Sequence, residues 1–331
     1  MKTPLLLVAL FFACASMASA WGNLGHQTIG VLGLQVLQNE NPAEYAKVEK
    51  LLGGQTPQDA ATWMDDLKRA KKGTGPLKQA KGEPDNEATI FNRDFPDNHE
   101  WHFDNLPLGE TKYTDNDPFS APNDIVHEIN IAISVLEGKS TVHTPVQALR
   151  MIIHFTGDIH QPLHVGTGYY KPGANGAIAL VRDPALAAKL PMDVGGNDIL
   201  LPGVPDDGPY AAELHSFWDT NLVADSAHTS SAKKYAKALA ARYPTNEWKT
   251  SGDYHAWAEA WATESVALAD SAAYDGINPT QGTVNTAGTS VTASVTLPEN
   301  YEENNTVVAE KQIVKAAYRL ADLLGEIKYA K

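Results

Sequence analysis

The sequence has 331 residues and a formal net charge of −14 at pH 7, from 40 acidic and 26 basic side chains. This acidity excludes a protein that coats nucleic acid non-specifically, because such proteins present basic surfaces. It does not exclude a phosphate-containing substrate, since bound cations can reverse the local electrostatic field.

The first twenty residues have the composition of a secretory signal peptide. Lys2 is their only charged residue, an apolar run covers 5–13, and Ala18-Ser19-Ala20 is a cleavage site of the A-x-A type. The apolar run is too short to span a bilayer, and no later stretch approaches about 20 apolar residues. We therefore expect residues 1–20 to be removed and the mature chain to be secreted or periplasmic, without a membrane anchor.

The only cysteine, Cys14, lies in this expected signal. A mature chain without thiols excludes cysteine catalysis, disulfides and thiolate zinc sites, which leaves His and Asp as the ligand types for a metal. An exported protein without disulfides must be stabilised by its core or by bound metal.

Capping residues and apolar periodicity predict a mainly α chain that forms a single domain. Helices are expected, in chain order, at 24–37, from Thr56-Pro57 onward, at 124–136, from Thr144-Pro145 to a turn at Pro162, from Pro209 onward, and at 231–243, 253–274 and 307–329. The segment 71–98 is rich in Lys, Gly, Pro and Asn and is expected to be a long loop, and 166–209 is a second segment containing Gly and Pro. Thr and Val residues that alternate within 277–300 indicate a small β-hairpin or a surface loop.

The stretch from His154 to His164 concentrates potential metal ligands. It begins within the helix that Thr144 caps, where His154 and Asp158 are four residues apart and therefore share one face. Pro162 cannot continue a helix, so the chain should turn there and bring His164 back toward the same point. Two imidazoles and a carboxylate that converge in this way are typical of a zinc site. The alternative is a solvated helix end with ordinary histidines.

A second His-x-x-x-Asp pair, His215 and Asp219, again places both groups on one helical face. Two such pairs in a chain without thiols favour a metal site. Between them, Gly195-Gly196-Asn197 either lets the backbone approach a ligand closely or forms a simple turn.

Further candidate ligands lie earlier in the chain. Cleavage after Ala20 would make Trp21 the N-terminus, and a free α-amine, which titrates near 7.7–8.0, is readily available to a metal. Taken alone, His26 reads as a helix-surface histidine, and either Asp65 or Asp66 could be a ligand or belong to a solvated, salt-paired face. The aromatic and acidic cluster 99–105 could stack a base, although buried packing is the commoner role of such residues.

These motifs resemble those of the S1/P1 nuclease family, zinc-dependent exported nucleases related in fold to bacterial zinc phospholipases C. The resemblance covers essentially the whole mature chain and rests on Trp21, His26, Trp63-Met64-Asp65, Trp101-His102-Phe103, His154 to His164, Gly195-Gly196-Asn197, His215-x-x-x-Asp219 and the closing Ala316 to Leu324. It implies a nearly all-α catalytic domain, 21–331, with a minor β-hairpin.

The resemblance also implies three zinc ions per chain. One would be bound by Asp65, His102, His154 and Asp158. A close neighbour would share Asp158 and add His26 with the amine and carbonyl oxygen of Trp21. The third would be bound by His164, His215 and Asp219. The remaining histidines are expected to be structural or to contact ligands: His99, His127, His143, His160, His228 and His255.

The family chemistry that follows is hydrolysis of phosphodiester bonds in single-stranded DNA and RNA by a metal-bound hydroxide. The products would be 5′-phosphorylated nucleotides, and a 3′-nucleotidase activity is a further expectation. Catalytic roles would fall to Asp65, Asp158 and Lys68.

Two departures from the family pattern concern the substrate. The family commonly has an arginine where this chain has Lys68, and lysine lacks the bidentate fork of arginine. The family's base-contacting aspartate is replaced by Asn105, which both donates and accepts. Phe103 is the residue expected beneath the base, and Asn197 is a further expected substrate contact. The absence of the fungal members' disulfides favours a bacterial-type member.

Two other functions remain open on the sequence. A zinc-dependent phospholipase C would use the same metal cluster on phosphodiester lipids, and an exported zinc-binding protein would perform no catalysis. We expect a monomer, and the sequon at Asn304 matters only if the host glycosylates its proteins.

Overall fold

The computed structural model describes residues 21–331 except 72–86, 116–117, 205–211, 245–246 and 331. The expected signal peptide and Pro209, the expected start of a helix, therefore lie outside the described residues. The described helices are α1 (Gly22–Glu40), α2 (Pro42–Leu52), α3 (Pro57–Lys71), α4 (Glu87–Asp94), α5 (Ile125–Leu136), α6 (Pro145–Asp158), α7 (Pro184–Ala187), α8 (Leu214–Ser216), α9 (Leu222–Ala227), α10 (Ala232–Arg242), α11 (Trp257–Leu268) and α12 (Tyr301–Glu326). The expected mainly α class is confirmed.

Short segments of other helical types extend or join these helices. The 3₁₀ segments are η1 (Asn98–His102), η2 (Pro162–His164), η3 (Ala174–Gly176) and η5 (Tyr254–Ala256). The π-helical turns are η4 (Phe217–Asn221) and η6 (Ala269–Ala273).

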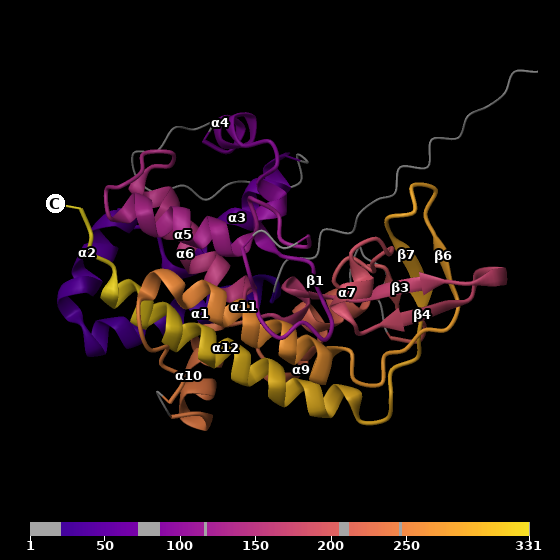
Figure 1. Ribbon diagram of the computed structural model, residues 1–331. Helices are drawn as coiled ribbons and strands as arrows, with labels where there is room; N and C mark the ends of the chain where they lie inside the picture. Colours follow the sequence, from indigo (N-terminus) through magenta and orange to yellow (C-terminus); the bar gives the residue numbers. More distant parts are fainter. Residues whose placement is uncertain (1–20, 72–86, 116–117, 205–211, 245–246, 331) are drawn as a thin grey trace, which may run out of the picture.

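Helix α1 lies at the centre of the helical part, packed against α12, α3, α10, α2 and α6 (Figure 1). Its approach to α3 requires Gly30, because a Cβ there would lie 2.8 Å from the carbonyl oxygen of Pro57. This enclosure leaves His26, in the first turns of α1, with no exposed surface.

Helix α6 begins with the capping box that the sequence predicts. The Thr144 hydroxyl accepts a hydrogen bond from the Gln147 backbone N–H, and the Gln147 side chain accepts one from the Thr144 N–H. Every residue from 148 to 158 is buried, beneath α5, α3 and α12. His154 and Asp158 are therefore interior residues and do not lie on a solvated helix end.

The described strands form three small sheets, and β3, β4, β6 and β7 lie to the right of the helices in Figure 1. Strand β1 (Leu106–Pro107) pairs in parallel with β2 (Gly166–Thr167), and β3 (Tyr169–Pro172) pairs antiparallel with β4 (Ile178–Val181). Strands β6 (Gly282–Val284) and β7 (Val291–Ser294) form the expected hairpin within 277–300, and β5 (Ile199–Leu200) adds to β7.

Several expected element bounds are wrong. The segment 71–98 is not one long loop, because it contains α4, whose Phe91 packs against Trp63 and Trp101. The segment 166–209 contains the β3–β4 hairpin. The helix that carries His215 begins at Leu214, and the last helix begins at Tyr301. None of the described helices is both long and apolar enough to cross a membrane.

Candidate metal centre

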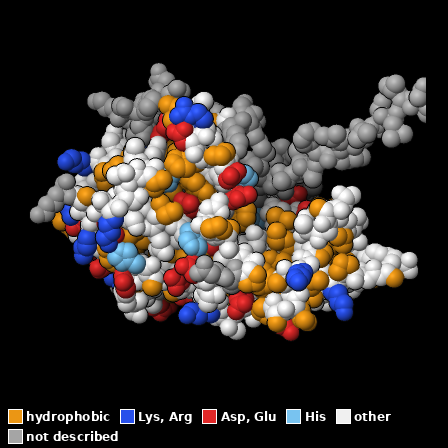
Figure 2. All heavy atoms as spheres, turned by 45° about the horizontal axis from the view of Figure 1, so that its top comes forward, with side chains coloured by type: hydrophobic (Ala, Val, Ile, Leu, Met, Phe, Trp, Pro, Cys, Tyr) orange, Lys and Arg blue, Asp and Glu red, His pale blue; other side chains and the backbone are white. Residues whose placement is uncertain are grey.

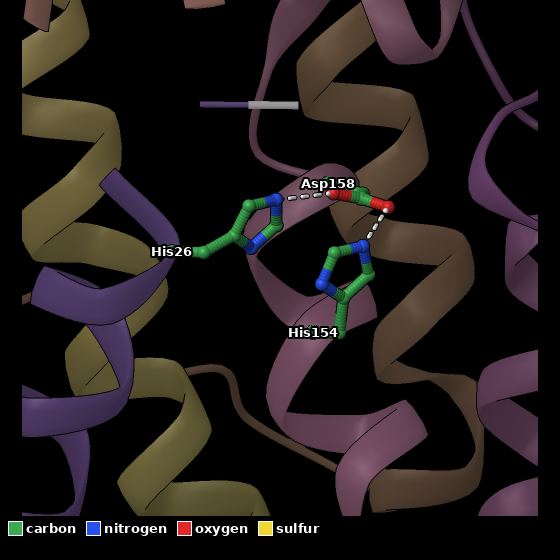
Figure 3. Close-up of side chains that lie close together, drawn as sticks. All are labelled: His26, His154 and Asp158. Atoms are coloured by element: carbon green, nitrogen blue, oxygen red, sulfur yellow. Dashed lines mark ion pairs between the residues drawn. The ribbon is translucent and has the colours of Figure 1, made fainter. Parts of the chain in front are cut away.

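Asp158 lies among three of the candidate ligand imidazoles, those of His26, His102 and His154. Its Oδ1 is 3.0 Å from His26 Nε2, and its Oδ2 is 3.2 Å from His154 Nε2 (Figure 3). Oδ2 also lies 2.8 Å from His102 Nδ1. Helices α1 and α6 and the 3₁₀ segment η1 thus each place an imidazole against one carboxylate.

Asp65, on α3, forms a second group of ligand-type side chains with His102 and His154. Its Oδ1 lies 3.9 Å from His154 Nε2, and together with His102 the three side chains place ligand atoms within 4.8 Å of one another. The first group, His26, His154 and Asp158, meets the same criterion. His154 belongs to both groups. The Lys68 ammonium is 3.2 Å from Asp65 Oδ1 and is mostly buried, so a positive charge borders this centre.

The third group consists of His164, His215 and Asp219. His164 Nε2 lies 3.0 Å from His215 Nε2, and His215 Nε2 lies 3.4 Å from Asp219 Oδ2. The interruption by η4 leaves the i, i+4 proximity of His215 and Asp219 intact. All three residues are buried, and the three ligand atoms again lie within 4.8 Å of one another.

The hydrogen bonds of the two histidines show that this third group suits a cation. His164 Nδ1 is 2.6 Å from the His102 carbonyl oxygen, and His215 Nδ1 is 2.7 Å from the Gly195 carbonyl oxygen. A carbonyl oxygen only accepts, so each Nδ1 carries the proton and each Nε2 of the neutral ring carries a lone pair. Two lone pairs facing each other at 3.0 Å repel unless a proton or a metal cation lies between them. Tetrahedral zinc, with Zn–N of about 2.0–2.1 Å, separates two ligand nitrogens by about 3.3 Å.

Burial keeps most of these imidazoles in the neutral form that binds metal. It lowers the pKa of His102 and of His164 to about 3 and that of His215 to about 4, and Lys68 adds to the lowering for each of them. Burial also lowers the pKa of His26. His154 is the exception, because the Asp158 and Asp65 carboxylates outweigh its burial and raise its pKa.

The pKa values of the three carboxyl groups likewise shift in different directions. Burial alone would raise the pKa of Asp158 and of Asp65, but facing charges outweigh it: His154 and His26 lower the pKa of Asp158, and Lys68 and His154 lower that of Asp65. Burial raises the pKa of Asp219 well above its usual range. A cation at the third group would compensate the negative charge of this carboxylate.

The three groups are connected through the backbone. The ring of His164 donates to the carbonyl of His102, and the N–H of Asp104 donates to the carbonyl of His164 at 2.8 Å. At the other side, the fully buried Trp21 places its backbone nitrogen 3.2 Å from Asp219 Oδ1. Trp21 therefore contacts the third group through Asp219.

The structure separates side chains that the sequence left as alternatives. Asp66 pairs with Arg69 and lies outside the three groups. None of the six remaining histidines belongs to a metal-type group in the described part of the chain. His143, for example, packs among Phe91, Phe95 and Trp101.

The expected substrate contacts lie beside the ligands. Phe103 directly follows His102 and is half-buried. The Asn105 side-chain oxygen accepts a hydrogen bond from the Thr167 hydroxyl. The Asn197 side-chain amide donates to the Val194 carbonyl at 2.8 Å, so part of its hydrogen-bonding capacity serves the local turn.

Sequence reasoning missed the residues that orient the ligands. Gln161 is fully buried, donates to Asp219 Oδ1 at 2.7 Å and accepts from the Leu163 N–H at 2.7 Å. The Ala61 carbonyl accepts from His154 Nδ1 at 2.7 Å. The position of Gln161 between the two ligand histidines of the central stretch was the one available signal; a backbone carbonyl leaves none.

Comparisons with known proteins agree with this geometry. A family model described as S1/P1 Nuclease matches residues 21–328. Nuclease S1 of Aspergillus oryzae is 27% identical over 335 residues, which cover 96% of each chain. Nuclease P1 of Penicillium citrinum is 27% identical over 93% of this chain and 97% of its own. Endonuclease 5 of Arabidopsis thaliana is 26% identical over 95% of this chain and 92% of its own. The chain therefore belongs to the S1/P1 nuclease family and is an enzyme of the nuclease class.

Proposed function

We propose that this chain is an exported zinc-dependent nuclease that hydrolyses single-stranded DNA and RNA to 5′-phosphorylated nucleotides, with 3′-nucleotidase activity. The observation that carries the proposal is the convergence of buried His and Asp side chains in three connected groups. At the third group, two buried imidazoles face each other through their Nε2 atoms at 3.0 Å, a distance that a cation bound between two neutral rings would make favourable.

Three zinc ions fit this donor set. Nitrogen and carboxylate oxygen are the ligand atoms that zinc prefers when no thiol is present. The proposed ligands are Trp21, His26, Asp65, His102, His154, Asp158, His164, His215 and Asp219. Zinc at these groups would supply an activated water and would neutralise charge on the phosphodiester.

Asp158 is the ligand that we propose the two neighbouring metal ions share. Its Oδ1 faces His26 and its Oδ2 faces His102 and His154, so the carboxylate lies between the two neighbouring groups and sets their spacing. Asp65 balances the charge of Lys68 on one side and faces His154 on the other. Both carboxylates thereby orient the imidazoles before substrate arrives.

Lys68 is proposed to bind the phosphate. Its ammonium keeps a positive charge next to the first two groups, and its influence on the pKa of His102 and His215 extends to the third. An ammonium can donate to a non-bridging phosphate oxygen and stabilise the charge that develops there during attack.

Phe103 and Asn105 are proposed to recognise the base. Phe103 is half-buried and directly follows His102 in the chain, and an unpaired base could stack on its ring. Because the Asn105 oxygen already accepts from Thr167, the side chain offers its NH₂ group to acceptors on the base. A base in a duplex could not reach this position, which supports the preference for single strands. Asn197 is proposed as a further substrate contact beside the third group.

The described side chains on the face shown in Figure 2 form no continuous basic patch, which supports recognition at the metal centre. Figure 2 shows Lys and Arg side chains singly or in small groups, with acidic side chains among them.

We further propose that residues 1–20 are a removed signal, that 21–331 form one catalytic domain, and that the enzyme is a secreted or periplasmic monomer. The family match, which begins at residue 21, supports this division.

The test is a substrate panel on the purified mature protein: single-stranded DNA, duplex DNA, RNA, 3′-nucleotides and phosphatidylcholine vesicles. We expect cleavage of both single-stranded polymers, much slower cleavage of duplex, and 5′-phosphate ends. Cleavage of the lipid alone would establish the phospholipase alternative. Metal binding without hydrolysis of any substrate would establish a zinc-binding protein, and fewer than two zinc ions per chain would refute the three-ion site.

A further inference from the structure

The backbone turn at Val194–Gly196 orients His215. Its Gly195 carbonyl accepts the hydrogen bond from His215 Nδ1 at 2.7 Å, and its Gly196 carbonyl accepts one from the His215 backbone N–H at 3.3 Å. The first bond fixes both the tautomer and the direction of the ring. The position of Nε2, which faces His164, therefore depends on where this turn holds its carbonyl groups.

This turn is strained. Val194, Gly195 and Gly196 have successive φ values of 56°, 59° and 79°. A β-branched residue rarely adopts a positive φ, because its side chain collides with the backbone there. Such a conformation persists only where surrounding contacts impose it.

Asp193 supplies those contacts. Its fully buried carboxylate accepts four hydrogen bonds: from the N–H of Gly168 at 3.2 Å, the N–H of Gly196 at 3.0 Å, the Tyr274 hydroxyl at 2.7 Å and the Tyr170 hydroxyl at 2.9 Å. One end of the strained turn is therefore bonded to β3 and to the residue that follows η6.

The turn also abuts the segment of the other histidine. A Cβ on Gly195 would lie 2.3 Å from the carbonyl oxygen of Leu163, the residue before His164. It would also lie 3.5 Å from His215 Nδ1. The turn is thus wedged between the two imidazole-bearing segments of the third group.

We propose that Asp193, with Tyr170 and Tyr274, is a positioning residue for the third metal site, acting through the strained turn and the Gly195 carbonyl on His215. This inference rests on the proposed metal-binding function and extends it to residues that touch neither metal nor substrate. Asp193 makes the geometry of the third group a property of the folded chain, present before any ion binds.

The test compares Asp193→Asn with the wild-type protein by zinc titration against a chelator of known affinity. Loss of an orienting partner weakens metal binding by roughly 10- to 100-fold, so we expect this shift for one ion per chain and no change for the other two. Long-range ¹H–¹⁵N NMR of the metal-free proteins gives a second readout. The His215 ring should be a single Nδ1–H tautomer in the wild type and a mixture in the variant.

Glu310→Gln is the matched control. Glu310 is a buried carboxylate that accepts from the Tyr243 hydroxyl, outside the three groups. Its loss should lower the melting temperature without changing any zinc affinity. If Asp193→Asn does not fold, Tyr170→Phe removes one of the four hydrogen bonds and should produce a smaller shift in the same direction.

Unchanged affinity for all three ions and an unchanged His215 tautomer in the folded Asp193 or Tyr170 variant would overturn the inference. A wild-type protein that binds three ions but cleaves no nucleic acid would refute the proposed activity alone. The comparison of zinc affinities would still decide the role of Asp193.

Discussion

Lys68 occupies the position where we expect the family to carry an arginine. Its ammonium lies 3.2 Å from Asp65 Oδ1, with only 8% of the residue exposed. If this centre binds phosphate as proposed, a buried cation beside it stabilises developing charge more strongly than a solvated one does.

We expect Lys68→Ala to lower kcat by roughly 100-fold or more, the effect typical of removing one donor to a developing oxyanion. Lys68→Arg should retain most of the activity, because it preserves the charge and adds a bidentate fork. Steady-state kinetics on a single-stranded oligonucleotide measures both. Arg69→Ala is the control, since Arg69 pairs with Asp66 away from the ligand groups; an equal loss in this variant would contradict a specific role for Lys68.

At the scale of single residues, the sequence predicted which side chains a helix brings close together, and little else. The i, i+4 pairs His154 with Asp158 and His215 with Asp219 follow from helical spacing. The choice of Asp65 over Asp66 did not follow from spacing, because adjacent helical residues differ in direction by about 100° and only packing decides which one faces inward. Carbonyl partners such as that of Gly195 carry no side-chain signal.

Among the elements, η1 carries His102 and is packed by an aromatic cluster around His143. The imidazole of His143 lies 4.6 Å from the Phe95 ring and 5.6 Å from the Trp101 ring. Burial lowers the pKa of His143 to about 4. The unfolded chain, with an ordinary histidine pKa near 6.5, therefore binds this proton more readily than the folded one does.

The contribution of His143 to stability is complete above pH 6.5 and is lost as the pH falls from about 6.5 to about 4. Linkage gives a loss of roughly 2 kcal/mol between pH 7 and pH 5. His143→Phe should remove this part of the pH dependence, so urea unfolding at the two pH values should differ less in the variant than in the wild type. The exposed His228→Asn should behave like the wild type; identical slopes for all three proteins would refute the assignment.

Helix α6 permits a direct measurement of its start signal. Thr144→Ala removes the side-chain cap and should lower the free energy of unfolding by about 1 kcal/mol, without loss of kcat. Chemical denaturation measures this difference. Thr141→Ala, at an exposed position three residues earlier, should change stability little; equal effects of the two variants would show that the capping box is not the cause.

Element starts with a capping residue and proline were predictable, as at Thr144-Pro145. The same signal at Asn41-Pro42, which opens α2, was overlooked although Asn41 caps the helix through its side chain. Helix α4 was hidden because its surroundings are rich in loop-forming residues, and its stability comes from Phe91 packing on distant aromatic rings. The π-turn η4 has no sequence signal of its own.

At the scale of the whole molecule, the buried residue just before α1, Trp21, would connect the proposed signal cleavage to the metal centre. Trp21 has no exposed surface, and its backbone nitrogen lies 3.2 Å from Asp219 Oδ1. If the mature chain begins here, the amine lies in the interior beside a ligand, and any preceding residue must displace it.

A single residue retained before Trp21 should therefore lower activity at least tenfold and reduce zinc content. A protease-cleavable extension allows each preparation to serve as its own reference, because removal of the extension should restore both properties. An extension of the C-terminus provides the control. Full activity with the N-terminal extension still in place would contradict the use of the amine as a ligand.

The overall class was predictable because helical periodicity persists along most of the chain. The three small sheets were less so, since β1 pairs with β2 across sixty residues and β5 pairs with β7 across more than ninety. Strands of two residues have too little pattern to reveal a partner. Tertiary packing determines where they meet: β2 contacts α11, η2 and η6, and β5 contacts α8.

The parallel β1–β2 pair has a further consequence. Strand β1 begins shortly after His102, and β2 begins shortly after His164. The His164 ring also donates to the His102 carbonyl. The span between the proposed paired ions and the third ion is therefore set by the main-chain pairing of β1 with β2 and by one hydrogen bond from a ligand ring to the backbone, none of which involves the side chains that would contact the base. If the proposed function is correct, substitutions at Phe103 or Asn105 would change which bases are bound and would not change which phosphodiester bond is cleaved. Base selectivity and the point of scission are then separate traits, open to alteration one at a time.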